Sequence, residues 1–396
     1  MNVTGIIAEY NPMHNGHICQ LAKARLTGKA DFTVAVMSGN FTQRGEPALC
    51  DKWTRAGMAV EAGVDLVLEL PFVYATGSAE YFAEGAVAVM RGLGVVTHLC
   101  FGSEAGDTGP LKELADILIA EPPEYREELK KQLENGVSFP KARQEAVQKL
   151  TKYADLLKQP NNILAVEYLK AIGHNNDIIP ITVKRTDAAH GDTSSESNEF
   201  ASGAAVRKAI IEGRPEDAAR FVPETTASVI ASDDFRPADP NDPGFYALIR
   251  SEILRRKPEE LASIFGAEEG IENRLLKYIR KAGTLEELIS SVGTKRYTDT
   301  GMRRLLLHIL MGFQKCDLHA CTPYARILGF NENGAKLLKY IKENETASIP
   351  VITKIGRGAD ENEMARLDIE ASDMYSLAFG SNIYKESDFV KKPYIK

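Results

Sequence analysis

The sequence predicts an α/β protein with a Rossmann-like parallel sheet, followed by an all-helical C-terminal domain. Two observations lead to this fold class. The first 110 residues alternate short apolar runs with helical patterns, whereas no convincing strand pattern follows Pro215. Strand–helix–strand repeats of this length are typical of a doubly wound sheet. At about 100–200 residues per domain, a chain of 396 residues predicts two domains, which we place at 1–222 and 240–396.

Four apolar runs in the first 110 residues predict strands. Each is short, rich in Val, Ile, Leu and Phe, and nearly continuous in its apolar character, as expected for parallel strands covered on both faces. These runs are Val3–Ala8, Phe32–Met37, Asp65–Leu70 and Val95–Phe101. Between them, apolar residues recur at the helical period in His17–Leu26, Lys52–Ala62 and Ala79–Leu93.

The middle of the chain is mostly helical. Residues 111–170 carry a helical pattern that is interrupted by prolines at 122–123, 140 and 160. Ile178–Lys184 predicts a further strand and Gly203–Glu212 a further helix. Between these two, the polar, serine-rich stretch Asp187–Glu199 predicts a mobile loop beside a site.

Prolines mark the expected domain boundary. Four of them lie from Pro223 to Pro243, a density typical of a break between elements. The helices expected beyond it are Ala247–Arg256, Gly270–Ala282, Thr284–Ser290, Met302–Met311 and Gly334–Glu343.

Composition narrows the class of protein. With 44% hydrophobic and 26% charged residues the chain is globular, and no stretch approaches the ~20 apolar residues of a bilayer span. The first five residues carry no basic region, so no cleaved signal is expected. Five cysteines without CxxC spacing predict reduced thiols, a cytoplasmic location and no metal site. Of these, Cys316 and Cys321 are expected to be buried.

The net charge of −7 conceals an asymmetry. Residues 1–200 hold 19 Lys and Arg against 26 acids, whereas residues 241–360 hold 19 against 15, a net of +4. A local basic face attracts a polyanion because acids beyond about 10 Å are screened by salt. A solvated helical surface explains the same count equally simply.

The strongest functional signal is the first predicted strand–helix junction, Gly5 to His17. His14 and His17 are three residues apart at the start of a helix and therefore lie on one face. Free N–H groups at a helix start favour anions. The junction therefore predicts a cradle for a triphosphate. A His-x-x-His pair is also compatible with half of a metal site.

The string His14-Asn15-Gly16-His17 resembles the HxGH signature of the nucleotidyltransferase superfamily, whose members attack the α-phosphate of a nucleotide. The second signature of that superfamily, a serine-rich turn followed by Arg, is resembled by residues Ser202 to Arg207. This copy departs from the pattern at Ala204, where a hydroxyl is common.

Longer strings resemble the bacterial tRNA(Met) cytidine acetate ligase family over nearly the full length. They include TGIIAEYNPMHNGH, MSGNFTQRGEPAL, QPNNILAVEYLKA, ITVKRTDAAHGD and KRYTDTGMRRLLLHIL. The resemblance implies activation of acetate by ATP to acetyl-adenylate. It then implies acetylation of N4 of the wobble cytidine in the anticodon loop of elongator tRNA(Met).

The resemblance also implies the site residues. His14, His17, Arg207 and Ser202 are the expected catalytic residues. The expected ATP contacts are Ile7, Ala8, Glu9, Tyr10, Asn11, Pro12, Met13, His14, Asn15, Gly16, His17, Ile18, Cys19, Gln20, Gly102, Arg185 and one of Asn161 and Asn162. One of these two asparagines also qualifies as a helix N-cap. Mg²⁺ is expected with the ATP.

Two further features lie near the same predicted sheet edge. The loop Ser38–Pro47 holds Asn40, Gln43 and Arg44 between two glycines, and it is either a loop that closes over substrate or ordinary solvated polarity. Glu69 ends the third strand and is a candidate to accept from the target amine or to contact a Mg²⁺-bound water. No proton acceptor is identified by spacing alone.

The basic segment beyond residue 290 predicts RNA contacts. Its candidates are Lys295, Arg296, Tyr297, Arg303 and Arg304, since arginines on phosphates and an aromatic against an unstacked base are how proteins hold RNA loops. Part of the segment is alternatively core, because Leu305–Leu310 is apolar. Two other functions stay open at this point: a nucleotidyltransferase with a small phosphorylated acceptor, and an RNA-binding protein on a degenerate nucleotide fold.

Overall fold

The structure, a computed structural model, describes residues 1–173, 177–185, 201–268, 270–294, 297–316, 318–321, 323–356, 362–380 and 382–396. The expected loop Asp187–Glu199 lies outside these residues. Within them, the chain forms an eight-stranded sheet of order β5-β4-β1-β2-β3-β6-β7, with β8 paired to β6. The strands are β1 (Val3–Ala8), β2 (Phe32–Ser38), β3 (Leu66–Leu70), β4 (His98–Ser103), β5 (Ile179–Lys184), β6 (Ala325–Phe330), β7 (Val351–Ile352) and β8 (Tyr394–Ile395).

Strands β1 to β5 are parallel to one another, which confirms the predicted α/β sheet. Alternate residues of these strands enter two hydrophobic clusters. Ile7 and Val36 pack with α4 and α8 on one face, and Ile6 and Ala35 pack with α1 and α2 on the other. Because both faces are covered, the strands are apolar at nearly every position. The four helices are α1 (Asn15–Thr27), α2 (Lys52–Glu61), α4 (Ala79–Gly92) and α8 (Pro160–Ile172).

Strand β6 corrects the expectation that the chain beyond Pro215 is all helical. It lies antiparallel to β3, and β7 and β8 pair with it in turn. Residues of the expected second domain therefore complete the sheet of the first. The strand escaped prediction because Arg326 interrupts its short apolar run, and this arginine is fully buried.

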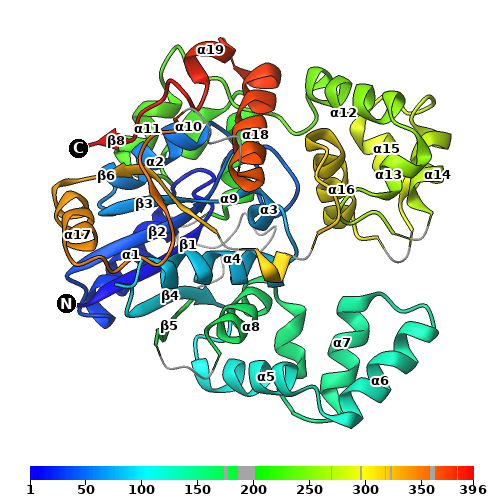
Figure 1. The fold of residues 1–396 in the computed structure, drawn as a ribbon, viewed down its shortest axis with the longest axis horizontal. Coiled ribbons are helices and arrows are strands. Elements are labelled where there is room, and N and C mark those ends of the chain that lie inside the picture. Colours follow the sequence, from blue (N-terminus) through cyan, green and yellow to red (C-terminus); the bar gives the residue numbers. More distant parts are fainter. Residues whose placement is uncertain are drawn as a thin grey trace.

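A group of helices stands beside the sheet at the right of Figure 1. It consists of α12 (Pro243–Arg255), α13 (Pro258–Ala262), α14 (Ile271–Tyr278), α15 (Leu285–Val292) and α16 (Asp299–Met311). These bounds confirm the four helices predicted between residues 247 and 311. Below it, α5 (Thr108–Ala120), α6 (Pro123–Glu134) and α7 (Phe139–Gln148) form a second projection.

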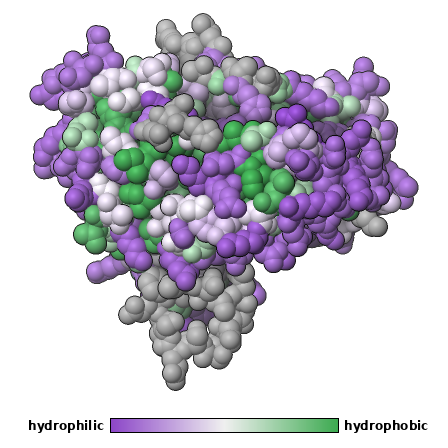
Figure 2. All heavy atoms as spheres, turned by 90° about the horizontal axis from the view of Figure 1, so that it is seen from below, coloured by the Kyte–Doolittle hydropathy of each residue, from purple (hydrophilic) through white to green (hydrophobic). Residues whose placement is uncertain are grey.

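The prolines of the middle segment begin helices, since proline is well accommodated in a first turn. Pro123, Pro140 and Pro160 lie in the first turns of α6, α7 and α8. Figure 2 views the molecule from the side of α5 and shows hydrophilic side chains over most of its right-hand part. Among the described residues, no helix combines the length and apolarity needed to cross a membrane.

The remaining helices are α3 (Phe72–Ala75), α9 (Gly203–Ile211), α10 (Pro215–Ala219), α11 (Glu224–Ile230), α17 (Glu332–Glu343), α18 (Glu363–Phe379) and α19 (Ile383–Glu386), with 3-10 turns at Ala154–Lys158 and Leu318–Ala320. The expected boundary 223–243 is partly helical, because α11 lies within it.

Candidate active site

His14 and His17 lie against each other where β1 ends and α1 begins. His14 is the N-cap of α1, and its Nδ1 accepts the Gly16 N–H at 3.1 Å. In return, the His14 N–H donates to Nδ1 of His17 at 3.2 Å. The two rings stack with their centroids 3.7 Å apart. The arrangement is a capping box built from two imidazoles.

These hydrogen bonds fix the tautomer of both rings. Because each Nδ1 accepts, a neutral ring carries its proton on Nε2. Burial, together with Arg185 and Arg207, lowers the pKa of His14 to about 4. Burial and His14 lower the pKa of His17 well below its usual range. Both rings are therefore neutral at pH 7, and each has an Nε2–H to donate to a ligand oxygen.

Gly16 allows this stacking. A Cβ at position 16 would lie 2.9 Å from Cε1 and 3.1 Å from Nδ1 of His14. Any side chain there would displace the ring, so the glycine of the motif is a steric requirement of its own histidine.

The start of α1 does not offer the free N–H groups that we expected. The Asn15 N–H donates to the Phe221 carbonyl at 2.9 Å, and the His17 N–H donates to the His14 carbonyl at 2.8 Å. The Gly16 N–H is taken by His14. The prediction of free backbone donors is therefore wrong, because these three N–H groups already have acceptors within the protein. Imidazole and guanidinium groups are the donors that remain.

Helix α9 brings the second signature to the histidines. Ser202 is its N-cap, and the hydroxyl oxygen accepts the Ala205 N–H at 3.2 Å. A Cβ on Gly203 would lie 3.5 Å from both His14 Nε2 and Arg207 Nη1. Arg207 also donates from Nη1 to the Asn11 carbonyl at 2.9 Å. The structure thus gathers all four predicted catalytic residues, which are 185 or more positions apart in sequence between the two motifs.

Arg185 and Gly102 lie together at the ends of β5 and β4. The Arg185 N–H donates to the Ser103 carbonyl at 2.9 Å. A Cβ on Gly102 would lie 3.2 Å from Cγ of Arg185, so the aliphatic stem of the arginine passes over the glycine. Among the described residues, neither Arg185 nor Arg207 forms an ion pair. Within the described residues, the site therefore holds two positive charges that form no ion pair.

Asn161 and Asn162 have different surroundings. Gln159, and neither asparagine, is the N-cap of α8, which corrects the N-cap expectation. The Glu104 carboxylate instead accepts their N–H groups, at 3.2 and 2.8 Å. Asn162 is fully buried, with Oδ1 accepting from Ala105 and Nδ2 donating to Gln159. Asn161 is half-buried, and its Nδ2 donates to Glu104 at 2.7 Å.

The other predicted ATP contacts divide into buried and accessible groups. Asn11 is buried, and its Oδ1 accepts the Leu49 N–H at 2.7 Å. Gln20 is half-buried and donates to the Cys100 carbonyl at 3.2 Å. The buried residues shape the loop, and their side chains are closed to a ligand. They are Ile7, Tyr10, Asn11, Pro12 and Met13, whereas Ala8, Glu9, Ile18, Cys19 and Gln20 are half-buried.

The loop 38–47 joins the ATP site to the helical group. Its Gln43 N–H donates to Glu9 Oε1 at 2.8 Å, and the Gln43 carbonyl accepts from Arg304 Nη1 at 3.2 Å. Gly45 has a φ of +77°, and a Cβ there would lie 2.4 Å from the Arg304 nitrogen. The loop is therefore packed against α16, which leaves Arg44 as its exposed cation.

Two of the predicted RNA contacts, Arg303 and Arg304, lie at this joint. Arg303 is 13% exposed and pairs with Glu46 at 3.6 Å and with Glu286. Burial lowers the pKa of Arg304. The Tyr297 hydroxyl bonds the backbone of the 266–268 turn. Lys295 and Arg296 lie outside the described residues.

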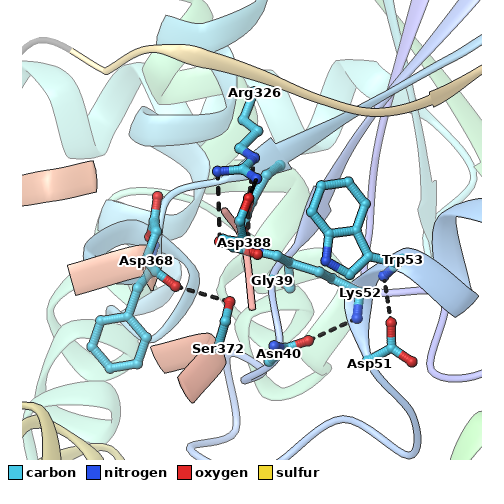
Figure 3. Close-up of polar contacts among 12 residues, drawn as sticks. Gly39, Asn40, Asp51, Lys52, Trp53, Arg326, Asp368, Ser372 and Asp388 are labelled. Carbon is cyan, nitrogen blue, oxygen red and sulfur yellow. Dashed lines mark hydrogen bonds and ion pairs between the residues drawn. The ribbon is translucent and has the colours of Figure 1, made fainter. Parts of the chain in front are cut away.

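A second charged cluster, which the sequence did not suggest, lies at the ends of β2 and β3 (Figure 3). Lys52 Nζ lies 2.7 Å from Glu69 Oε1 and 2.7 Å from Asp388 Oδ2. Arg326 Nη1 lies 3.5 Å from the same Asp388 oxygen. Burial opposes the charge of Lys52, but Asp388 and Glu69 outweigh it and raise the pKa of the lysine. We call Lys52, Glu69, Arg326 and Asp388 the buried network.

The contacts of Glu69 in the buried network contradict both roles that we considered for it. Both carboxylate oxygens of Glu69 bond Lys52, and the residue is 3% exposed. It is therefore closed to a target amine or a metal-bound water. Only the strand-end position of Glu69 was visible in the sequence, because Asp388 lies 336 positions from Lys52.

Side chains that could bind a metal ion are not clustered in the described part of the chain. No group of three or more His, Cys, Asp or Glu side chains there is arranged to hold a metal ion. Cys316 is exposed and Cys321 is half-buried, so the expectation that both are buried is wrong.

Comparisons with known proteins agree with this geometry. Residues 1–388 match the family model described as HIGH Nucleotidyl Transferase. A tRNA(Met) cytidine acetate ligase of Clostridium perfringens (strain SM101 / Type A) is 41% identical, and one of Thermoanaerobacter sp. (strain X514) is 40% identical; each match covers 100% of both chains. The crystal structure of Thermotoga maritima TmcAL bound with alpha-thio ATP is 34% identical, with a TM-score of 0.88 over 100% of this chain and 99% of that chain.

Proposed function

The chain belongs to the HIGH nucleotidyl transferase family and, within it, to the tRNA(Met) cytidine acetate ligases, and from this premise we propose how its residues act. The chain is an ATP-dependent tRNA cytidine acetate ligase. We propose that acetyl-adenylate forms beside His14 and His17, and that its acetyl group passes to N4 of the wobble cytidine of elongator tRNA(Met). The observation that carries this proposal is the pair of neutral imidazoles, with fixed Nε2 donors, beside two arginines that form no ion pair among the described residues.

In the first step, an acetate oxygen attacks the α-phosphorus of ATP. A new bond forms from the acetate oxygen to phosphorus, the bond from phosphorus to the bridging oxygen breaks, and pyrophosphate leaves. Acetate is already ionised at pH 7, so no base is required. The demand is for positioning and for stabilisation of charge that develops on phosphate oxygens. His14 and His17 donate from Nε2, and Arg207 neutralises the leaving pyrophosphate, with Ser202 holding the start of α9.

Arg185, Gly102 and Asn161 hold the nucleoside end in this proposal. Asn161 is assigned rather than Asn162, because both polar groups of the Asn162 side chain already have protein partners. Gly102 lets the nucleotide approach the end of β4 without a side chain in its path. Mg²⁺ arrives with the ATP phosphates and takes oxygen ligands from them and from water, since the described residues offer no cluster of acids to hold it.

In the second step, N4 of cytidine attacks the acetyl carbon, AMP leaves, and the amine loses a proton. The wobble base must leave its stack to reach the site. We propose that the helical part of residues 240–396 docks the anticodon loop, with Lys295, Arg296, Tyr297, Arg303 and Arg304 near the joint. The enzyme works where its tRNA is, in the cytoplasm.

The test is exchange of radioactive pyrophosphate into ATP without tRNA. Acetate should drive this exchange, because the first step needs only acetate and ATP. Exchange that is indifferent to acetate would indicate a nucleotidyltransferase with another acceptor. A wild-type protein without ATP affinity in calorimetry would indicate an RNA-binding protein.

A further inference from the structure

Helix α14 and the turn that follows it carry a second group of cations. No acidic residue lies between Glu272 and Glu286, whereas four cations do: Arg274, Lys277, Arg280 and Lys281. Ile271, Leu275 and Ile279 bury the opposite side of this segment. Lys277, Arg280 and Lys281 are therefore exposed.

Three of the cations converge on one aromatic ring. The charged groups of Arg274, Lys277 and Lys281 lie 5.9, 5.3 and 5.9 Å from the ring centroid of Tyr278. Arg274 and Lys277 are three residues apart on one face of α14, and Lys281 contacts the same ring from the turn after the helix. Cation–π contacts with the ring are favourable. They also bring three positive charges close together, and a bound anion would reduce the repulsion between these charges.

The acids that flank this segment have other partners. Glu286 pairs with Arg303, Glu287 accepts the Gly283 N–H at 2.7 Å, and Glu272 accepts from Asn273 at 2.8 Å. Arg274 donates to carbonyls at the end of α15, including that of Val292 at 3.0 Å, so it also fixes α14 in place. Lys277, Arg280 and Lys281 form no ion pair within the described ranges.

We propose that Lys277, Arg280 and Lys281 are a binding surface for the phosphate backbone of the tRNA substrate; this rests on the proposed function. Figure 1 shows α14 at the outer edge of the helical group, away from the sheet. A contact there reaches a part of the tRNA remote from the reacting base. Phosphate contacts of this kind position a nucleic acid without reading its sequence.

Helix α17 provides a matched control. It also carries three exposed lysines and a tyrosine, Lys336, Lys339, Lys342 and Tyr340, but it lies at the opposite end of the molecule in Figure 1. Its Lys339 pairs with Glu343 at 3.7 Å. The two triple variants K277Q/R280Q/K281Q and K336Q/K339Q/K342Q therefore remove equal charge from two similar helices.

The experiment measures the affinity of wild type and both variants for an unmodified elongator tRNA(Met) transcript at several KCl concentrations. The α14 variant should bind about tenfold or more weakly, and the slope of log Kd against log salt should fall by about 2, since each lost phosphate contact removes roughly 0.7–0.9. The α17 variant should match wild type. Acetate-dependent pyrophosphate exchange without tRNA reports whether each variant keeps a working ATP site.

Two results would overturn the assignment of α14. Unchanged affinity of its variant would place the phosphates elsewhere, and equal losses in both variants would indicate a general effect of net charge. Absence of acetate-dependent exchange in wild type would instead refute the proposed function, and the assignment with it.

Discussion

Two charged groups lie at the same edge of the sheet and differ in where their counter-charges come from. In the buried network, Lys52 and Arg326 meet Glu69 and Asp388 inside the protein. At the ATP site, the described residues provide Arg185 and Arg207 with no acidic partner. The first group finds its counter-charges within the protein. In the proposed function the second group meets the phosphates of ATP, and this contrast separates structural charge from proposed ligand-binding charge.

The largest expected effect breaks the buried network. Replacing Asp388 with Ala leaves Lys52 and Arg326 buried with too little negative charge, and loss of one partner from such a network costs about 3–5 kcal/mol. Urea unfolding should report this loss in the free energy of unfolding. Glu343→Ala, which removes a surface partner of Lys339, should change it by under about 1 kcal/mol. A comparable decrease in the free energy of unfolding of both variants would contradict the distinction between the buried network and a surface ion pair.

His17→Ala should affect catalysis instead of stability. It removes one fixed donor to the phosphates, and loss of such a donor costs about 10²–10³ in rate. Acetate-dependent pyrophosphate exchange should fall by this factor, while tRNA affinity stays within about twofold of wild type. Simultaneous loss of exchange and tRNA binding would contradict the division between the ATP site and the docking surface.

The adjacent asparagines repeat the contrast on a smaller scale. Asn162→Ala leaves the Ala105 N–H and the Gln159 side chain without their hydrogen-bond partner in the interior. It should lower the free energy of unfolding by about 1–3 kcal/mol. Asn161→Ala should mainly raise the KM for ATP. Thermal melts and exchange kinetics on both variants test this, and a reversal of the two phenotypes would assign the nucleotide contact to Asn162.

The pH dependence of stability tests the neutral state of the histidines. The folded pKa of His14 is about 4, below the ordinary 6.5, so the unfolded chain binds the proton more readily as pH falls. The stability contributed by neutral His14 is complete above pH 6.5 and is lost toward pH 4. Between pH 6.5 and 5 the loss should be about 1–2 kcal/mol.

His14→Asn is the control, because asparagine keeps an N-cap but does not titrate. Urea titrations of both proteins at pH 6.5 and 5 should show the smaller decrease in the variant. Equal decreases would mean that His14 is protonated in the folded protein.

Local pattern was sufficient to predict the first five strands and the helices between them, and the resemblance of two short motifs implied that His14, His17 and Arg207 act together. Those features depend on periodicity or on a compact motif. It was not sufficient for β6, whose apolar run is interrupted by Arg326, nor for the partner of Lys52. It also did not show that the capping box uses the backbone donors, or that Arg303 is held by Glu46. Each of these depends on contacts between residues that are distant in sequence.

The position of Asp388 has a consequence for folding of the protein. Lys52 has one acidic partner close by in sequence, Glu69, and a second, Asp388, far along the chain. Contacts between residues so distant in sequence form slowly. We therefore expect the early strand–helix units to form with Lys52 already paired to Glu69, and Asp388 to complete the buried network only when the later part of the chain packs against the sheet.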